Sequence, residues 1–266
     1  MTPNNPAPSS GSTRRQFLKT TSAAALTTAV TPLAAARGVR RRNDVLRVGL
    51  VGCGGRGTGA AAQALTADPD TRLVALADTF GDQLDKCLTT LRGSQGIADR
   101  IDVADDMKFV GFDAYKGVVD NCDVVLLATS PYFRPMHVAY AVEAGKHLFV
   151  EKPIATDAPG VRSMLASVEL ARQKGLSLVS GLCYRYSFAK QATVERIHDG
   201  AIGDITSLQT TYNTTGLWHR GRKEDWSDME WQIRNWLYFT WLSGDHITEQ
   251  HIHSLDKIAW TMGSYP

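Results

Sequence analysis

The stretch that decides the fold is VGLVGCGGRGTGA, residues 48–60. An apolar run, typical of a buried strand, leads directly into Gly52-x-Gly54-x-x-Gly57, which opens a helix. In this pattern the first glycine permits a tight turn, the second lets the backbone approach a pyrophosphate, and the third lets helix and strand pack closely. The helix N-terminus then faces the phosphates. The loop therefore predicts a dinucleotide site that comprises Gly52, Gly54, Gly55, Arg56 and Gly57.

A carboxylate follows at the expected distance. Asp78 ends the apolar run RLVALAD, residues 72–78, and lies 21 residues after Gly57. There a carboxylate can accept hydrogen bonds from the adenosine ribose diol, and it repels a 2′-phosphate. This favours NAD over NADP, although Arg56 and Arg72 keep NADP open. A glycine-rich turn without a ligand is the alternative, and the position of Asp78 weighs against it.

Apolar runs and amphipathic segments alternate from residue 45 to residue 150. The runs VLRVGLVG, RLVALAD, DVVLLATS and KHLFVEKP are separated by helical stretches such as TGAAAQAL and MHVAYAVEAG. Nearly continuous apolar strands between helices predict a parallel sheet covered on both faces. We expect an α/β fold: a doubly wound Rossmann domain over residues 44–153.

A second domain is expected over residues 154–266. The pattern predicts helices over residues 157–174 and 188–198, a strand in LSLVSGL, residues 176–182, and a strand of a second sheet over residues 203–213. All six tryptophans follow residue 217, a shift in composition that fits a different domain. They suit either stacking on a sugar ring or core packing. The expected architecture is thus a doubly wound α/β domain followed by a second, α+β domain.

A family resemblance rests on residues 122–155, CDVVLLATSPYFRPMHVAYAVEAGKHLFVEKPIA. Thr129, Pro131 and His137, then Gly145-Lys146-His147, then Glu151-Lys152-Pro153 resemble the glucose-fructose oxidoreductase / inositol dehydrogenase (Gfo/Idh/MocA) family. The resemblance implies that Thr129, Pro131, His137, Glu151 and Lys152 contribute to the cofactor site. It also implies that Lys152 faces the nicotinamide and the reacting carbinol, with a cis bond before Pro153. A cation there favours the developing alkoxide; the alternative role for Lys152 is an ion pair with a neighbouring carboxylate.

A second match lies in SGDHITEQHIHSLD, residues 243–256. Family members carry Asp, His and Asp at the positions of Glu249, His253 and Asp256, on a helix that faces the substrate. Spacings of four and three put these residues on one helical face, so a carboxylate can orient the imidazole that removes the hydroxyl proton. A metal site formed by His246, Glu249 and His253 is an alternative. No HExxH pattern is present, however, and no metal is expected. By the same resemblance, Tyr184 and Arg185 line the substrate cleft.

These motifs predict an oxidoreductase that transfers hydride between a tightly held nicotinamide cofactor and a secondary alcohol of a sugar or polyol. NAD-assisted glycoside cleavage by oxidation and elimination is one alternative, and an inactive nucleotide-binding fragment is another. Members of the family usually continue further, whereas this sequence stops ten residues after Asp256. We expect a truncated second domain, and a homo-oligomer only for a complete chain.

The segment TRRQFLK, residues 13–19, has the pattern of a twin-arginine export signal. A run rich in Ala and Thr follows and ends in Ala34-Ala35-Ala36, so we expect a signal peptide over residues 1–36 and a linker over residues 37–43. The run is too short and too polar for a stable membrane anchor. Cleavage would lower the formal charge from +2 to −1, which does not suggest nucleic-acid binding. The expected partner is the twin-arginine export machinery and the expected location is the periplasm, where the cofactor would have to be recycled in place.

Overall fold

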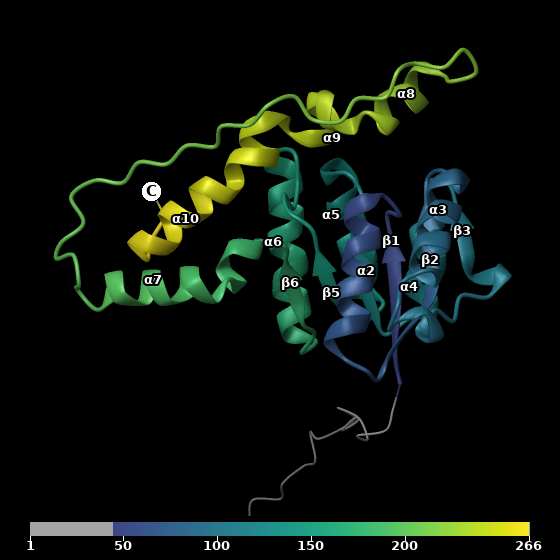
Figure 1. Cartoon of the computed structure of the whole chain (residues 1–266), viewed down its shortest axis with the longest axis horizontal. Coiled ribbons are helices and arrows are strands. Elements are labelled where there is room, and N and C mark those ends of the chain that lie inside the picture. Colours follow the sequence, from purple (N-terminus) through teal and green to yellow (C-terminus); the bar gives the residue numbers. More distant parts are fainter. Residues whose placement is uncertain (1–44, 266) are drawn as a thin grey trace, which may run out of the picture. The chain divides into compact units, whose positions relative to one another are not determined.

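The computed structural model describes residues 45–265. The signal peptide over residues 1–36 and the linker over residues 37–43 lie outside this range, so both stay predictions. Figure 1 gives the labels of the elements used below.

A six-stranded parallel sheet carries the fold (Figure 1). Its strands are β1 (Leu46–Val51), β2 (Thr71–Asp78), β3 (Lys108–Val110), β4 (Val124–Leu127), β5 (His147–Val150) and β6 (Leu178–Ser180). They lie in the order β3-β2-β1-β4-β5-β6, and every neighbouring pair is parallel. Because the order reverses between β1 and β4, a crevice opens there beyond the carboxyl ends of the strands, which is where such sheets bind ligands. The predicted doubly wound sheet is confirmed.

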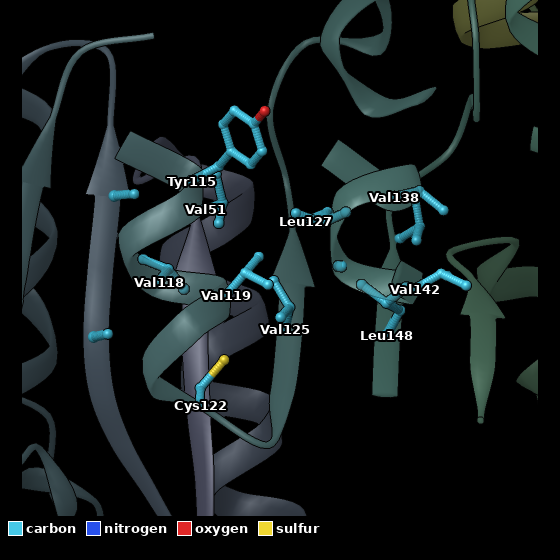
Figure 2. Packing of buried hydrophobic residues seen from close by; sticks show 14 of the residues in the cluster. Val51, Tyr115, Val118, Val119, Cys122, Val125, Leu127, Val138, Val142 and Leu148 are labelled. Carbon is cyan, nitrogen blue, oxygen red and sulfur yellow. The ribbon is translucent and has the colours of Figure 1, made fainter. Parts of the chain in front are cut away.

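Helices cover both faces of the sheet. They are α2 (Gly55–Ala67), α3 (Gly81–Arg92), α4 (Ala114–Asn121), α5 (Arg134–Glu143) and α6 (Ala158–Gln173). Side chains of α2 and α3 pack in one apolar cluster, and those of α4, α5 and α6 pack in the other. In Figure 2, Val119 of α4 lies beside Val125 of β4, in the cluster that also contains Val118, Val138 and Leu127. Alternate residues of β4 and β5 supply the two clusters, as the period-two geometry of a strand requires.

The sheet continues past Pro153, where the sequence placed the domain boundary. Strand β6 pairs with β5, with Leu178 opposite Leu148. Strand β6 is therefore part of the Rossmann sheet, and α6 connects it to β5. After Gly181 the described residues are helical or irregular. They include α7 (Phe188–His198), α8 (Asp228–Arg234), α9 (Thr240–Ser243), a π-helix (Ile247–His251) and α10 (Ile252–Met262).

The strand predicted over residues 203–213 is not formed. Residues 205–223 have no regular secondary structure. The alternation of apolar and polar residues is typical of a strand. A strand also needs a neighbouring strand that forms hydrogen bonds with its backbone N–H and C=O groups. Within residues 181–265 there is no other strand to pair with it. No helix of the described range is long and apolar enough to cross a membrane.

Candidate cofactor and substrate site

A cavity of about 780 Å³ opens at the carboxyl ends of β1, β2 and β4. Eight of the predicted cofactor residues line it: Gly52, Gly54, Gly55, Arg56, Gly57, Asp78, Thr129 and His137. Pro131, Glu151 and Lys152 do not line it. The cavity also has a wall that the sequence did not predict, formed by Trp218, Trp236 and their neighbours.

The glycine loop has the geometry that a pyrophosphate requires. Gly52 has φ +96°, a left-handed conformation that suits glycine, and a Cβ on Gly57 would lie 1.8 Å from the carbonyl oxygen of Gly52. A Cβ on Gly54 or Gly55 would meet nothing within 4 Å, so this side of the loop is open. Helix α2 begins there with no side-chain cap and no acidic residue in its first turn. Its free N–H groups therefore fit an anionic ligand.

Asp78 is held at the end of β2 by the backbone. Its Oδ2 accepts a hydrogen bond from the N–H of Cys53 at 2.7 Å, and its Oδ1 accepts one from Phe80 at 2.9 Å. Burial raises the pKa of the Asp78 carboxyl, and the two N–H groups oppose that rise. Each oxygen keeps a further lone pair for a ribose hydroxyl. Arg72 lies six residues earlier, about 20 Å along the strand, so it is not placed to bind a 2′-phosphate.

Arg56 and Glu151 form an ion pair between the glycine loop and the end of β5. Arg56 Nε lies 2.5 Å from Glu151 Oε1, and the Glu151 side chain is buried. Glu151 Oε2 also accepts a hydrogen bond from the N–H of Lys152 at 3.3 Å. Glu151 thus links the cofactor loop to the residue predicted to be catalytic, and it does so without lining the cavity.

His137 and Thr129 lie side by side at the end of β4, with Thr129 Oγ1 3.4 Å from His137 Nδ1. Burial and the charge of Arg134 lower the pKa of His137 to about 4, so the ring is neutral near pH 7. Arg134 was not predicted, although it lies within the quoted motif. Its fully buried guanidinium donates to the carbonyl oxygens of Thr129 and Pro153, which joins the ends of β4 and β5.

Lys152 makes a buried ion pair with Glu249. The distance from Lys152 Nζ to Glu249 Oε1 is 2.7 Å, and Nζ also donates to the Glu249 carbonyl oxygen at 2.5 Å. The side chains are 14% and 7% exposed. An ammonium group has three N–H donors, so one remains for a substrate hydroxyl. The Lys152–Pro153 bond is cis, as the resemblance implied.

His253 is buried beside two tyrosines. Its ring lies 5.1 Å from that of Tyr184, edge to face, and 6.3 Å from that of Tyr212, nearly parallel. Nδ1 is buried, and among residues 45–265 it has no hydrogen-bond partner. Burial, then the charge of Lys152, lowers the pKa of His253, which keeps the imidazole neutral near pH 7 and able to accept a proton.

The carboxylates expected to orient His253 pair with other residues. Glu249 binds Lys152, and Asp256 receives Arg185 Nε at 2.8 Å. Glu249 lies in the π-helix, whereas His253 and Asp256 lie in α10, so the three are not on one regular helix. The expected contact of these carboxylates with His253 is therefore not formed, because the change from π to α geometry rotates Glu249 relative to His253.

Tyr184 lies next to His253, and Arg185 reaches the same helix through Asp256. Their predicted place in the substrate cleft stays a prediction. Tyr212 was missed because it lies in the segment predicted to be a strand. None of the six tryptophans is fully buried. Residues 45–265 contain no cluster of three or more side chains that could hold a metal ion.

The glycine loop and Asp78, at the carboxyl ends of β1 and β2, define a dinucleotide-binding domain of the Rossmann class. Residues 46–182 match the Gfo/Idh/MocA family, described as "Oxidoreductase family, NAD-binding Rossmann fold". The chain belongs to this family, and its Rossmann domain is of the NAD-binding type.

Two curated relatives illustrate the range of activities among similar proteins. "Glycosyl hydrolase family 109 protein 1" of Bacteroides fragilis is 27% identical over 180 residues, which cover 66% of this chain and 36% of the relative. A "dTDP-3,4-didehydro-2,6-dideoxy-alpha-D-glucose 3-reductase" of Actinomadura kijaniata is 25% identical over 169 residues, covering 63% and 45%. The chain thus spans less than half the length of these relatives.

Solved structures share the fold. The WlbA dehydrogenase of Bordetella pertussis, in complex with NADH and UDP-GlcNAcA, superposes with a TM-score of 0.61 at 21% identity, covering 82% of this chain and 56% of that one. Scyllo-inositol dehydrogenase of Lactobacillus casei, with NAD(H) and scyllo-inositol, gives 0.58 at 21% identity, covering 83% and 57%.

Proposed function

We propose that this protein oxidises or reduces a secondary alcohol of a sugar or polyol with a tightly held NAD. The observation that carries the proposal is the buried ion pair of Lys152 and Glu249. Lys152 follows Glu151, which pairs with Arg56 in the lining of the dinucleotide cavity. A fixed cation close to the cofactor loop, with the neutral imidazole of His253 near it, supports hydride transfer at a secondary alcohol.

His253, Lys152 and Glu249 each have a separate role in the proposed reaction. His253 accepts the proton of the hydroxyl group, because its lowered pKa leaves it neutral. Lys152 directs its remaining N–H at the same oxygen and stabilises the negative charge that develops there. Glu249 holds the ammonium in position. When bound, NAD supplies the hydride acceptor, so the alcohol becomes a carbonyl and the proton goes to His253.

Absorbance of the reduced nicotinamide tests this function directly. Candidate polyols added to the protein with bound NAD should raise that absorbance in a single turnover, by at most one equivalent of the bound cofactor, and Lys152→Ala and His253→Ala should each abolish the rise. Binding of NAD without any rise for a broad set of sugars and polyols would contradict the proposal.

Glycoside cleavage by oxidation, elimination and re-reduction is the second candidate. The similarity to proteins named as family 109 glycosyl hydrolases favours it, and it uses the same base and cation. It predicts release of sugar from a glycoside with no net change in NADH. Release that is independent of Lys152 and His253 would exclude this route.

We also propose that the protein is exported folded by the twin-arginine route to the periplasm, with its cofactor already bound. TRRQFLK supports this, since that route carries folded proteins. The periplasm offers no pool for exchanging the cofactor, so turnover should be redox-neutral. Retention of NAD through gel filtration supports this, and rapid loss on dilution contradicts it.

A further inference from the structure

The dinucleotide cavity is closed on one side by a segment far away in the sequence. Trp218, Arg220, Ile233, Arg234 and Trp236 line it opposite the glycine loop. These residues belong to a folded segment, residues 217–239, which we call the flap. The flap comprises an irregular stretch, α8 and the 3-10 turn Trp236–Tyr238.

The flap is held together by its own contacts, so it acts as one piece. The fully buried Asn235 accepts a hydrogen bond from the N–H of Arg220 at 2.7 Å and donates to the carbonyl oxygen of Arg220 at 3.1 Å. The hydroxyl of Tyr238 donates to the carbonyl oxygen of Leu217 at 2.8 Å. These bonds join the irregular stretch to the helical part, and a wall of this kind moves as a unit or not at all.

The side chain of Arg234 connects the flap to the Rossmann domain. Arg234 donates from Nη2 to Asp82 Oδ1 at 2.8 Å and from Nη1 to Asp82 Oδ2 at 3.0 Å, a bidentate pair. Its guanidinium also stacks 3.8 Å from the ring centre of Phe80. Of the ion pairs within residues 45–265, this is the only one that joins the flap to the sheet and its covering helices.

The contact of Arg234 with Asp82 and Phe80 lies at the adenosine end of the cavity. Phe80 and Asp82 follow Asp78, the predicted partner of the ribose, by two and four residues. The Arg234 side chain is only 10% exposed, and Arg234 lowers the pKa of Asp82 to about 2. The pair is therefore charged at any physiological pH, and it joins the flap to the residues that follow Asp78.

We infer that the flap is the outer wall of the NAD site and that the contact of Arg234 with Asp82 and Phe80 is a latch that must open before the cofactor can leave. This rests on the proposed use of NAD and explains how the protein retains it. Trp218 and Trp236 thereby become cofactor-site residues alongside those of the glycine loop.

The rate of NADH release tests the latch. Because Trp218 and Trp236 line the cavity, bound NADH should accept excitation energy from tryptophan, and a chase with excess NAD reports its departure. Arg234→Met keeps most of the side-chain volume but removes the bidentate pair, and it should speed release at least about tenfold, since loss of a buried charge partner acts on the dissociation rate. Arg222→Met is the matched control. Arg222 also belongs to the flap and pairs with a carboxylate, Asp228, but that partner lies within the flap.

Asp82→Asn removes the negative charge that Arg234 binds in the latch. The Asp82 side chain is exposed, so the substitution should not impair folding. Removing a negative charge near an anionic cofactor would by itself slow release, so faster release from this variant identifies the latch. Arg234→Met combined with Asp82→Asn should release NADH no faster than the faster single variant, because both break one contact. Release at the wild-type rate from both single variants overturns the inference while leaving the proposed function standing. A protein that binds no NADH overturns both.

Discussion

At the scale of single residues, the Lys152–Glu249 pair predicts an asymmetry in stability. Lys152→Met leaves the Glu249 carboxylate buried and unpaired, which should lower the free energy of unfolding by about 3–5 kcal/mol. Lys152→Met together with Glu249→Leu removes both charges and should be more stable than Lys152→Met alone. Urea unfolding of the three proteins without cofactor measures this. Equal stability of the single and double variants would mean that the pair is not buried in solution.

His137 predicts a dependence of stability on pH. Its pKa is about 4 in the folded protein against about 6.5 when unfolded, so between these values the unfolded chain binds the extra proton. The free energy of unfolding should therefore fall as the pH drops from 6.5 towards 4, by about 3 kcal/mol from this residue. Urea unfolding at pH 7.5 and pH 4.5 should show a smaller loss for His137→Gln than for the wild type. An identical loss in both proteins would assign the effect to other groups.

At the scale of elements, two glycines of α2 predict opposite effects. In Gly57→Ala the new Cβ would lie 1.8 Å from the Gly52 carbonyl oxygen, which forces the helix away from β1. We expect loss of NAD binding and destabilisation of about 1–3 kcal/mol. Gly59→Ala, in the same helix, meets only the flexible Arg56 side chain at 3.6 Å and should stabilise by about 0.5–1 kcal/mol. Calorimetric titration with NAD and thermal unfolding distinguish the two. Similar behaviour of both variants would contradict close packing at Gly57.

The elements also show which parts of the structure could be predicted from sequence. The strands of the sheet and the glycine loop follow from local patterns: apolar runs, and backbone positions that only glycine can occupy. The segment over residues 203–213 has the pattern of a strand, but pairing depends on a partner elsewhere in the chain. Lys152 and His253 were identified through a resemblance. The partner of Glu249, and the wall formed by Trp218 and Trp236, depend on contacts between distant residues that no local pattern encodes.

At the scale of the whole molecule, the predicted export signal can be tested by a minimal change. Arg14→Lys with Arg15→Lys keeps the charge of the segment but removes the paired guanidinium groups that define the pattern. The protein should then remain in the cytoplasm, as measured by fractionation and immunoblotting. Arg41→Lys with Arg42→Lys, in the basic run after Ala36, is the control and should not change the location. Export of the first variant at the wild-type level would show that the segment is not a twin-arginine signal.

The flap also determines when the NAD site becomes complete during synthesis of the chain. The glycine loop and Asp78 are complete once residue 78 has left the ribosome, but Trp218, Arg234 and Trp236 emerge only after about 140 to 160 further residues. A nascent chain can thus present the phosphate-binding loop long before it can enclose a cofactor. Secure loading of NAD must await nearly the whole described chain. Cofactor capture would then mark a chain whose synthesis has passed residue 236, before any export machinery engages it.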